Sequence, residues 1–238
     1  MSKNFDLVVL VNPNSRTGRH VPGAELRSIL SQAPDTTRVW VDETYVDYVG
    51  GAESLEQFAA LSTNVVVCKS MSKVYALSRL RAAYLCGPHH LMEELRGITP
   101  PWAVSLPAQV AAVRALNDPP YYELQYRETH HQRRQLASEL SALGFDVVPG
   151  TANFILCHVP EARTSASELR EQCRTRNLFL RDVTDMGVRT DAVRIAVKDG
   201  ATNRQMVQII ADVLDGTRPR RAGAHVELGA SPLESAVR

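Results

Sequence analysis

The sequence has 238 residues, enough for one large domain or two small ones, and its 44% hydrophobic content is close to that of globular proteins. Its 27 basic and 26 acidic residues give a formal net charge of +1, which argues against nucleic acid as the main partner. No apolar run approaches the roughly 18 residues of a membrane-spanning helix, so no membrane partner is expected. The four cysteines lack metal-ligand and CxxC spacing, which predicts no metal site and favours a reducing cytoplasm.

The first part of the chain alternates between apolar runs that suit buried strands and a helical pattern. The helical pattern predicts a helix over Pro22–Gln32. The apolar runs predict four strands, at Leu7–Val11, Arg38–Val41, Asn64–Cys68 and Ala82–Cys86. Continuous Val-rich strands separated by helices indicate an α/β fold, with a mostly parallel sheet buried on both faces. Ligands of such sheets gather at the carboxyl ends of the strands.

A mixed pattern follows a break near Thr99–Pro101 and predicts a small α+β domain. Its expected helices are Leu106–Asn117, Tyr121–Leu143, Ser165–Arg176 and Asn203–Leu214. Its expected strands are Phe145–Val148, Phe154–His158, Leu178–Arg181 and Ala192–Val197. Tyr121–Leu143 is long and polar enough to link two lobes, and its arginines, Arg133 among them, are expected on a solvated face. We therefore expect a large domain over 1–105, a small domain with its linking helix over 106–216, and a disordered tail over 217–238.

The segment Ser70-Met71-Ser72-Lys73 follows the Val-rich third strand. A lysine at a strand end can form an imine with an aldehyde cofactor, and neighbouring hydroxyl and backbone N–H groups can hold a phosphate. Arg81, eight residues after the lysine, could add a charge-assisted hydrogen bond to the same phosphate. A solvated lysine on a loop is the alternative interpretation.

Two further residues stand where a polar group needs a partner. Asp42 ends the second strand, where burial is costly without a partner such as a protonated pyridine nitrogen; Tyr45 follows three residues later. A helix N-cap and a packed tyrosine are the alternative for this pair. Arg194 lies inside an apolar strand and needs an anion, which is either a substrate carboxylate or a structural Asp or Glu.

Taken together, five segments resemble the fold-type I, pyridoxal-phosphate (PLP) dependent aminotransferases of class I/II. The likeness runs from about Val8 to Leu214 and is greatest to the histidinol-phosphate aminotransferase and threonine-phosphate decarboxylase group. The segments are Ser15-Arg16-Thr17-Gly18, Asp42-Glu43-Thr44-Tyr45, Ser70-Met71-Ser72-Lys73 with Arg81, Ala152-Asn153-Phe154 and Val193-Arg194-Ile195.

The resemblance implies a PLP-dependent aminotransferase that acts on an amino acid and a 2-oxo acid. Lys73 would carry the internal aldimine and act as general base, a role that burial and nearby positive charge favour. The remaining roles concern the cofactor's ring, its phosphate and the substrate carboxylate. Asp42 would hold the pyridinium nitrogen and Tyr45 the phenolic oxygen; the phosphate would be bound by Ser70, Ser72 and Arg81, and the carboxylate by Arg194 with Asn153 close by.

The sequence departs from the family at several points. Ser15 stands where the family has the asparagine that touches the phenolic oxygen, and Asn14 is a possible substitute. Arg16 replaces a proline, and Arg79 replaces a glycine. Family members also have a long stretch ahead of the point that matches Met1, so we expect uncovered sheet edges and apolar faces.

Three functions therefore remain open: an aminotransferase, a decarboxylase or cyclase of the same fold, and a non-catalytic or partner-dependent remnant. By resemblance a homodimer is expected.

Overall fold

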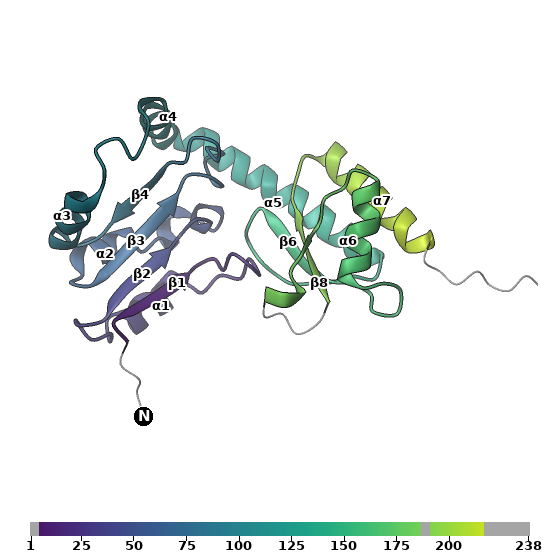
Figure 1. Cartoon of the computed structure of the whole chain (residues 1–238), viewed down its shortest axis with the longest axis horizontal. Coiled ribbons are helices and arrows are strands. Elements are labelled where there is room, and N and C mark those ends of the chain that lie inside the picture. The colour runs from purple at the N-terminus through teal and green to yellow at the C-terminus, as the bar shows by residue number, and fades with distance from the viewer. Residues whose placement is uncertain (1–4, 187–190, 217–238) are drawn as a thin grey trace, which may run out of the picture.

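The computed structural model describes residues 5–186 and 191–216, which form two sheets connected through a long helix (Figure 1). The first sheet has the order β1-β2-β3-β4 and consists of β1 (Leu7–Val11), β2 (Arg38–Asp42), β3 (Val65–Ser70) and β4 (Ala83–Cys86). The first three strands are parallel, and β4 runs antiparallel to β3. The predicted α/β fold with a mostly parallel sheet is confirmed.

One face of this sheet is covered by α1 (Gly23–Leu30) and α2 (Glu56–Leu61). The side chains buried there come from both helices and from alternate strand positions: Leu26, Leu30, Val39, Val41, Leu55, Ala59, Val65 and Val67. The short 3-10 helices Val46–Tyr48 (η1) and Gly51–Glu53 (η2) connect β2 to α2. The sequence analysis missed α2, which is only six residues long and has no side-chain cap to signal its start.

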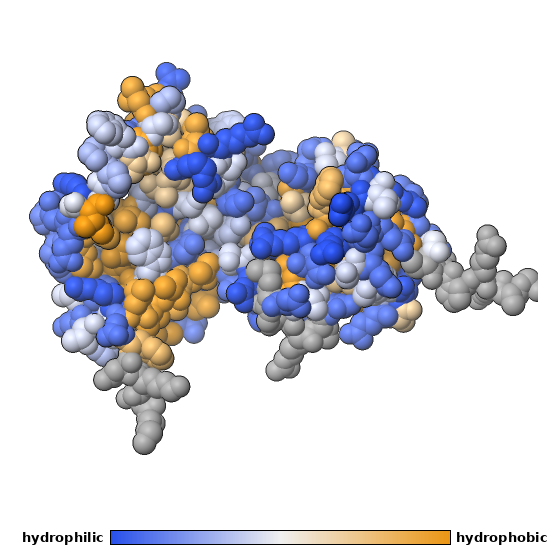
Figure 2. Space-filling view, in the orientation of Figure 1, coloured by the Kyte–Doolittle hydropathy of each residue, from blue (hydrophilic) through white to orange (hydrophobic). Residues whose placement is uncertain are grey.

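The other face of the same sheet is bare at β1 although Val66 of β3 is buried there, so the expectation of a sheet buried on both faces is wrong for β1. Leu7 and Val9 of β1 are 58% and 59% exposed. Helix α3 (His89–Ile98) covers only one end, where Leu91 and Leu95 line a pocket with Trp40 of β2. Figure 2 shows an apolar patch over β1 and β2. This agrees with the expectation that apolar faces of the sheet are uncovered.

The connection to the second sheet consists of α4 (Leu106–Leu116) and α5 (Pro119–Ala142), both close to their predicted ranges. Each begins with a proline in its first turn and a side-chain cap, from Ser105 and Asp118 respectively, which fixes where the helix starts. Arg133 of α5 corrects an expectation. It is buried, and it donates from Nε to the carbonyl oxygen of Gly150 (2.8 Å) and from Nη1 to that of Phe154 (2.7 Å).

The second sheet is antiparallel with the order β5-β6-β8-β7. Its strands are β5 (Asp146–Val147), β6 (Phe154–His158), β7 (Arg181–Asp182) and β8 (Ala192–Ala196), with the 3-10 helix Thr184–Met186 (η3) after β7. Helices α5, α6 (Ala166–Thr175) and α7 (Gly200–Gly216) enclose the apolar core on one face. The opposite face turns Phe154 and Arg194 toward the first sheet's loops.

The predicted strand Leu178–Arg181 is misplaced, because strand pairing begins only at Arg181. Asn177 has a left-handed backbone (φ 60°) at the end of α6, and Leu178 donates to the carbonyl of Cys173 instead of pairing with a strand. Among the described residues no helix is both long and apolar enough to span a membrane. The domain boundary at residue 105 stays a prediction, and the tail 217–238 lies outside the described residues.

Candidate functional site

The carboxyl ends of β2 and β3 bring Asp42 and the lysine loop to one edge of the sheet. Asp42 is in register with Cys68, and the N–H of Glu43 donates to the Cys68 carbonyl (2.9 Å), so Ser70 lies two residues beyond this pairing. One carboxylate oxygen of Asp42 accepts from the Thr44 N–H (2.9 Å) and hydroxyl (2.5 Å). Asp42 is half-buried and held in a defined orientation by this turn, and it caps no helix among the described residues, because the N-cap of η1 is Tyr45.

The loop after β3 gathers the three predicted phosphate-binding residues. The Ser72 N–H donates to Ser70 Oγ (3.4 Å), while Arg81 Nη1 donates to Ser72 Oγ (3.4 Å) and to the Ser78 carbonyl (3.0 Å). Arg81 adopts a left-handed backbone (φ 54°), which folds the loop back on itself. Lys73 lies in the same loop and is exposed, so its expected burial is wrong for this chain.

A second group of candidate residues meets across the two sheets. Arg194 Nη1 donates to the Ser15 carbonyl oxygen (2.6 Å), and its guanidinium carbon lies 4.5 Å from the centroid of the Phe154 ring. Phe154 in turn makes an edge contact with Tyr45 at 5.5 Å between centroids. Burial raises the pKa of Tyr45, which Arg194 partly opposes, and burial lowers the pKa of Arg194. Among the described residues Arg194 thus donates to a backbone carbonyl and makes no ion pair with an Asp or Glu. A substrate carboxylate stays a prediction.

The turn after β1 supports this group through its backbone. Asn14 Oδ1 accepts from the N–H groups of Arg16 (3.0 Å) and Thr17 (3.1 Å), so the oxygen of this side chain stabilises its own turn. The Gly18 carbonyl, from a residue with φ 73°, accepts from the Thr151 N–H (2.8 Å). The turn is therefore docked on the second sheet, close to Arg194.

Asn153, expected near the substrate carboxylate, has its side chain hydrogen bonded to Tyr48 of η1. Burial raises the pKa of the Tyr48 hydroxyl to about 12, and a side-chain hydrogen bond with Asn153 opposes this shift. Asn153 thereby connects the second sheet to η1.

A buried charge cluster that the sequence analysis missed lies on the helix-covered side of the same strand ends. Lys69 of β3 is 4% exposed, and its Nζ lies 3.3 Å from Asp47, 3.2 Å from Glu56 and 3.9 Å from Glu43. The available signal was a lysine inside the apolar run of β3, which predicts a buried cation with an anionic partner.

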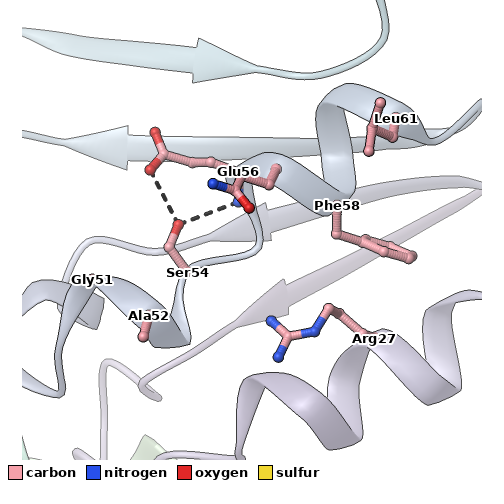
Figure 3. A pocket seen from close by; sticks show the side chains of 8 residues that line it. Arg27, Gly51, Ala52, Ser54, Glu56, Phe58 and Leu61 are labelled. Atoms are coloured by element: carbon pink, nitrogen blue, oxygen red, sulfur yellow. Dashed lines mark hydrogen bonds between the residues drawn. The ribbon is translucent and has the colours of Figure 1, made fainter.

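A surface pocket of about 450 Å³ adjoins this cluster between α1 and α2 (Figure 3). Figure 3 shows Ser54 hydrogen bonded to Glu56, with Arg27 on the opposite wall. None of the predicted site residues lines the pocket.

Comparisons with known proteins identify the family of the chain. The family model described as "Aminotransferase class I and II" matches residues 1–214, so the chain belongs to that family. A curated histidinol-phosphate aminotransferase from Rhodopseudomonas palustris (strain BisB18) is 33% identical over 217 residues, which are 90% of this chain and 59% of the relative. The chain thus spans about three-fifths of the length of such relatives.

Two solved structures share the fold. L-threonine-O-3-phosphate decarboxylase from Porphyromonas gingivalis has a TM-score of 0.77 and 25% identity, covering 89% of this chain and 65% of that one. Histidinol-phosphate aminotransferase from Sinorhizobium meliloti, solved in complex with pyridoxal-5'-phosphate, has a TM-score of 0.80 and 20% identity, covering 89% and 58%.

Proposed function

We propose that this chain provides the PLP-binding lysine loop and the substrate arginine of an aminotransferase that moves an amino group from an amino acid to a 2-oxo acid. The observation that carries the proposal is the loop after β3. There the hydroxyls of Ser70 and Ser72 and the guanidinium of Arg81 surround the backbone that presents Lys73, beside Asp42 on the paired strand. Family membership and the names of the relatives support it.

The residues present fit the cofactor by their donor and acceptor chemistry. Two hydroxyls and a guanidinium suit a phosphate, a half-buried carboxylate suits a pyridinium, and the Tyr45 phenol suits a phenolic oxygen. When bound, PLP supplies an aldehyde carbon that attaches amines covalently and a ring that accepts electrons.

The chain's own side chains would then divide the work. Asp42 would keep the ring nitrogen protonated, and the Lys73 amine would hold the cofactor and move protons at the substrate carbon. Arg194 would orient the substrate by a bidentate contact to its carboxylate. The cofactor ring and the substrate would lie between the first sheet's edge and the face of β8 that carries Arg194.

Partners and substrate are proposed from the exposed apolar surface and from the names of the relatives. A homodimer is supported by the exposed apolar side chains along and before α4: Trp102 (90%), Leu106 (71%), Val110 (52%) and Val113 (58%). The curated relatives named histidinol-phosphate aminotransferases support a phosphorylated amine as one substrate. A cytoplasmic location stays a prediction.

Decarboxylation is the second candidate, favoured by the likeness to the P. gingivalis decarboxylase. The cofactor is the same in both reactions, and the bond that breaks depends on how the substrate is held. Release of carbon dioxide from an amino acid without any 2-oxo acid would favour this candidate over amino transfer.

The test is covalent capture of the cofactor. Purified protein incubated with PLP, reduced with borohydride and digested should carry the added mass on the peptide with Lys73, and Lys73→Ala should lose it. An exposed lysine, Lys198, should stay unlabelled in both proteins and serves as the control. Label spread over several lysines, or its absence from Lys73, would reject the proposal and favour a non-catalytic or partner-dependent chain.

A further inference from the structure

The buried cluster lies directly behind the two segments that form the candidate cofactor site. Lys69 precedes Ser70 in β3, and Glu43 follows Asp42 at the end of β2. Successive residues of a strand point to opposite faces, so Lys69 lies on the helix-covered side while Ser70 belongs to the opposite side. The cluster and the candidate site thus lie on opposite faces of the sheet, at the ends of the same two strands, β2 and β3.

Each carboxylate in the cluster comes from a different element. Glu43 accepts from the Leu55 N–H and the Ser54 hydroxyl, both at 2.7 Å, which joins the end of β2 to the start of α2. Asp47 lies in η1, two residues after Tyr45, and Glu56 opens α2. Lys69 therefore joins three elements to the strand that leads into the lysine loop.

The charges make Lys69 the residue on which the arrangement depends. Burial by itself lowers the pKa of Lys69, but Asp47, Glu56 and Glu43 together raise it, so the ammonium form persists. Burial raises the pKa of Glu43, which Ser54, Leu55 and Lys69 oppose. Without the ammonium, three acidic side chains would face one another in a desolvated space, and η1 would be pushed away from β3.

We propose that Lys69 is a positioning residue of the cofactor site, which holds the Asp42–Tyr45 segment at the correct distance from the loop of Ser70, Ser72 and Lys73. The proposal rests on the proposed function, because it concerns the residues expected to grip the two ends of PLP. Ring and phosphate contacts come from separate segments, so a shift of one segment relative to the other weakens both contacts at once.

The experiment compares PLP affinity in three variants by absorbance titration. Lys69→Met should weaken PLP binding on the order of 10-fold, within the usual range of coupling between sites, and Lys69→Arg should restore most of it. The matched control is Asn64→Ala at the opposite end of the same strand. Asn64 is buried and donates to the Pro34 and Thr37 carbonyls, so its loss should lower the melting temperature while leaving PLP affinity within about twofold of wild type.

A fourth variant and a spectroscopic readout separate positioning from simple destabilisation. Asp47→Asn keeps the shape of the side chain, removes one charge next to Lys69 and should weaken PLP binding in the same direction by less. The pH at which the bound cofactor's absorbance changes should move in Lys69→Met and not in Asn64→Ala, since only the former displaces Asp42.

The outcomes separate the two proposals. PLP uptake by wild type with unchanged affinity and absorbance in Lys69→Met and Asp47→Asn overturns the positioning role alone. Equal weakening by Asn64→Ala overturns it as well, because general destabilisation then explains the effect. A wild-type protein without any uptake overturns the proposed function and this inference with it.

Discussion

The two faces of the first sheet are made from alternate residues of the same strands, yet they differ in every physical respect. On one face Val39 and Val41 are packed under α1 and α2, and the buried Lys69 is matched by carboxylates. On the other, Leu7 and Val9 are exposed, and Asp42 and Ser70 lie on the same face at the carboxyl ends of their strands. The helix-covered face is therefore packed within the described residues, whereas the face that carries Asp42 and Ser70 leaves apolar side chains of β1 exposed to water.

The largest expected effect comes from removing the buried charge of the complete face. Lys69→Met should lower the free energy of unfolding by about 4 kcal/mol, because carboxylates would be left without their cation in a desolvated site. Urea denaturation measures this. A loss below about 1 kcal/mol would show that water reaches the cluster, through the pocket beside Glu56, and screens it.

The second effect compares apolar side chains on the two faces. Leu55, which is 1% exposed, should cost about 3 kcal/mol when changed to alanine, since a cavity would remain in the core. Leu7→Ala should change stability by less than about 0.5 kcal/mol. Equal losses in the two variants would mean that the bare face is covered in solution, for instance by a second copy.

The third prediction concerns alkaline pH. Because its partners raise the pKa of Lys69 above the ordinary 10.5, its stabilising contribution is complete below that value and is lost as the pH rises through the folded-state pKa. The stability difference between wild type and Lys69→Met should therefore shrink above about pH 10.5, by at most about 1.4 kcal/mol per pH unit.

The carboxylates of Glu43, Asp47 and Glu56 surround the ammonium. Two phenols also lie near it, those of Tyr75 and of Tyr84, which is the register partner of Lys69. Burial raises the pKa of both phenols, and Lys69 partly opposes this for Tyr75. A difference that grows with pH would contradict the assignment of a charged Lys69.

The smallest effect sharpens the description of the bare face. The double change Leu7→Ser and Val9→Thr should reduce self-association in light scattering while leaving stability nearly unchanged, because it removes exposed apolar area only. Leu61→Ser is the matched control: Leu61 is 89% exposed but lies on α2, on the helix-covered side. If both changes reduce scattering equally, the association has no preference for the bare face.

Much of the fold could be predicted from periodicity and turn signals. Strands β1 and β6 coincide with their predicted ranges, and the long helix begins within two residues of its expected start, where proline and Asp118 mark its N-terminus. A continuous apolar run does not show which faces of the strand are covered by other elements. The Val-rich runs therefore predicted burial on both faces, although Leu7 and Val9 are exposed.

The candidate site was predictable only where a motif is contiguous. Ser70, Ser72 and Arg81 come together as expected, because one loop carries all three. Lys69 and Arg133 were not recognised as buried, because their partners are distant in sequence: the carboxylates of Asp47 and Glu56, and two backbone carbonyls from the second sheet. A charged residue in an apolar run predicts a buried partner but does not identify which residue that partner is.

The hydrogen bond from Arg194 to the Ser15 carbonyl joins residues 179 positions apart. It affects the affinity of any ligand that binds the guanidinium. An incoming anion that takes the Nη1 donor would replace the acceptor already in place, so for this one hydrogen bond the gain is the difference between a charged and a neutral acceptor. Uncharged analogues would gain nothing from the exchange. The Ser15 carbonyl would then favour carboxylates over uncharged ligands, because only a charged acceptor binds the guanidinium more strongly than this carbonyl does.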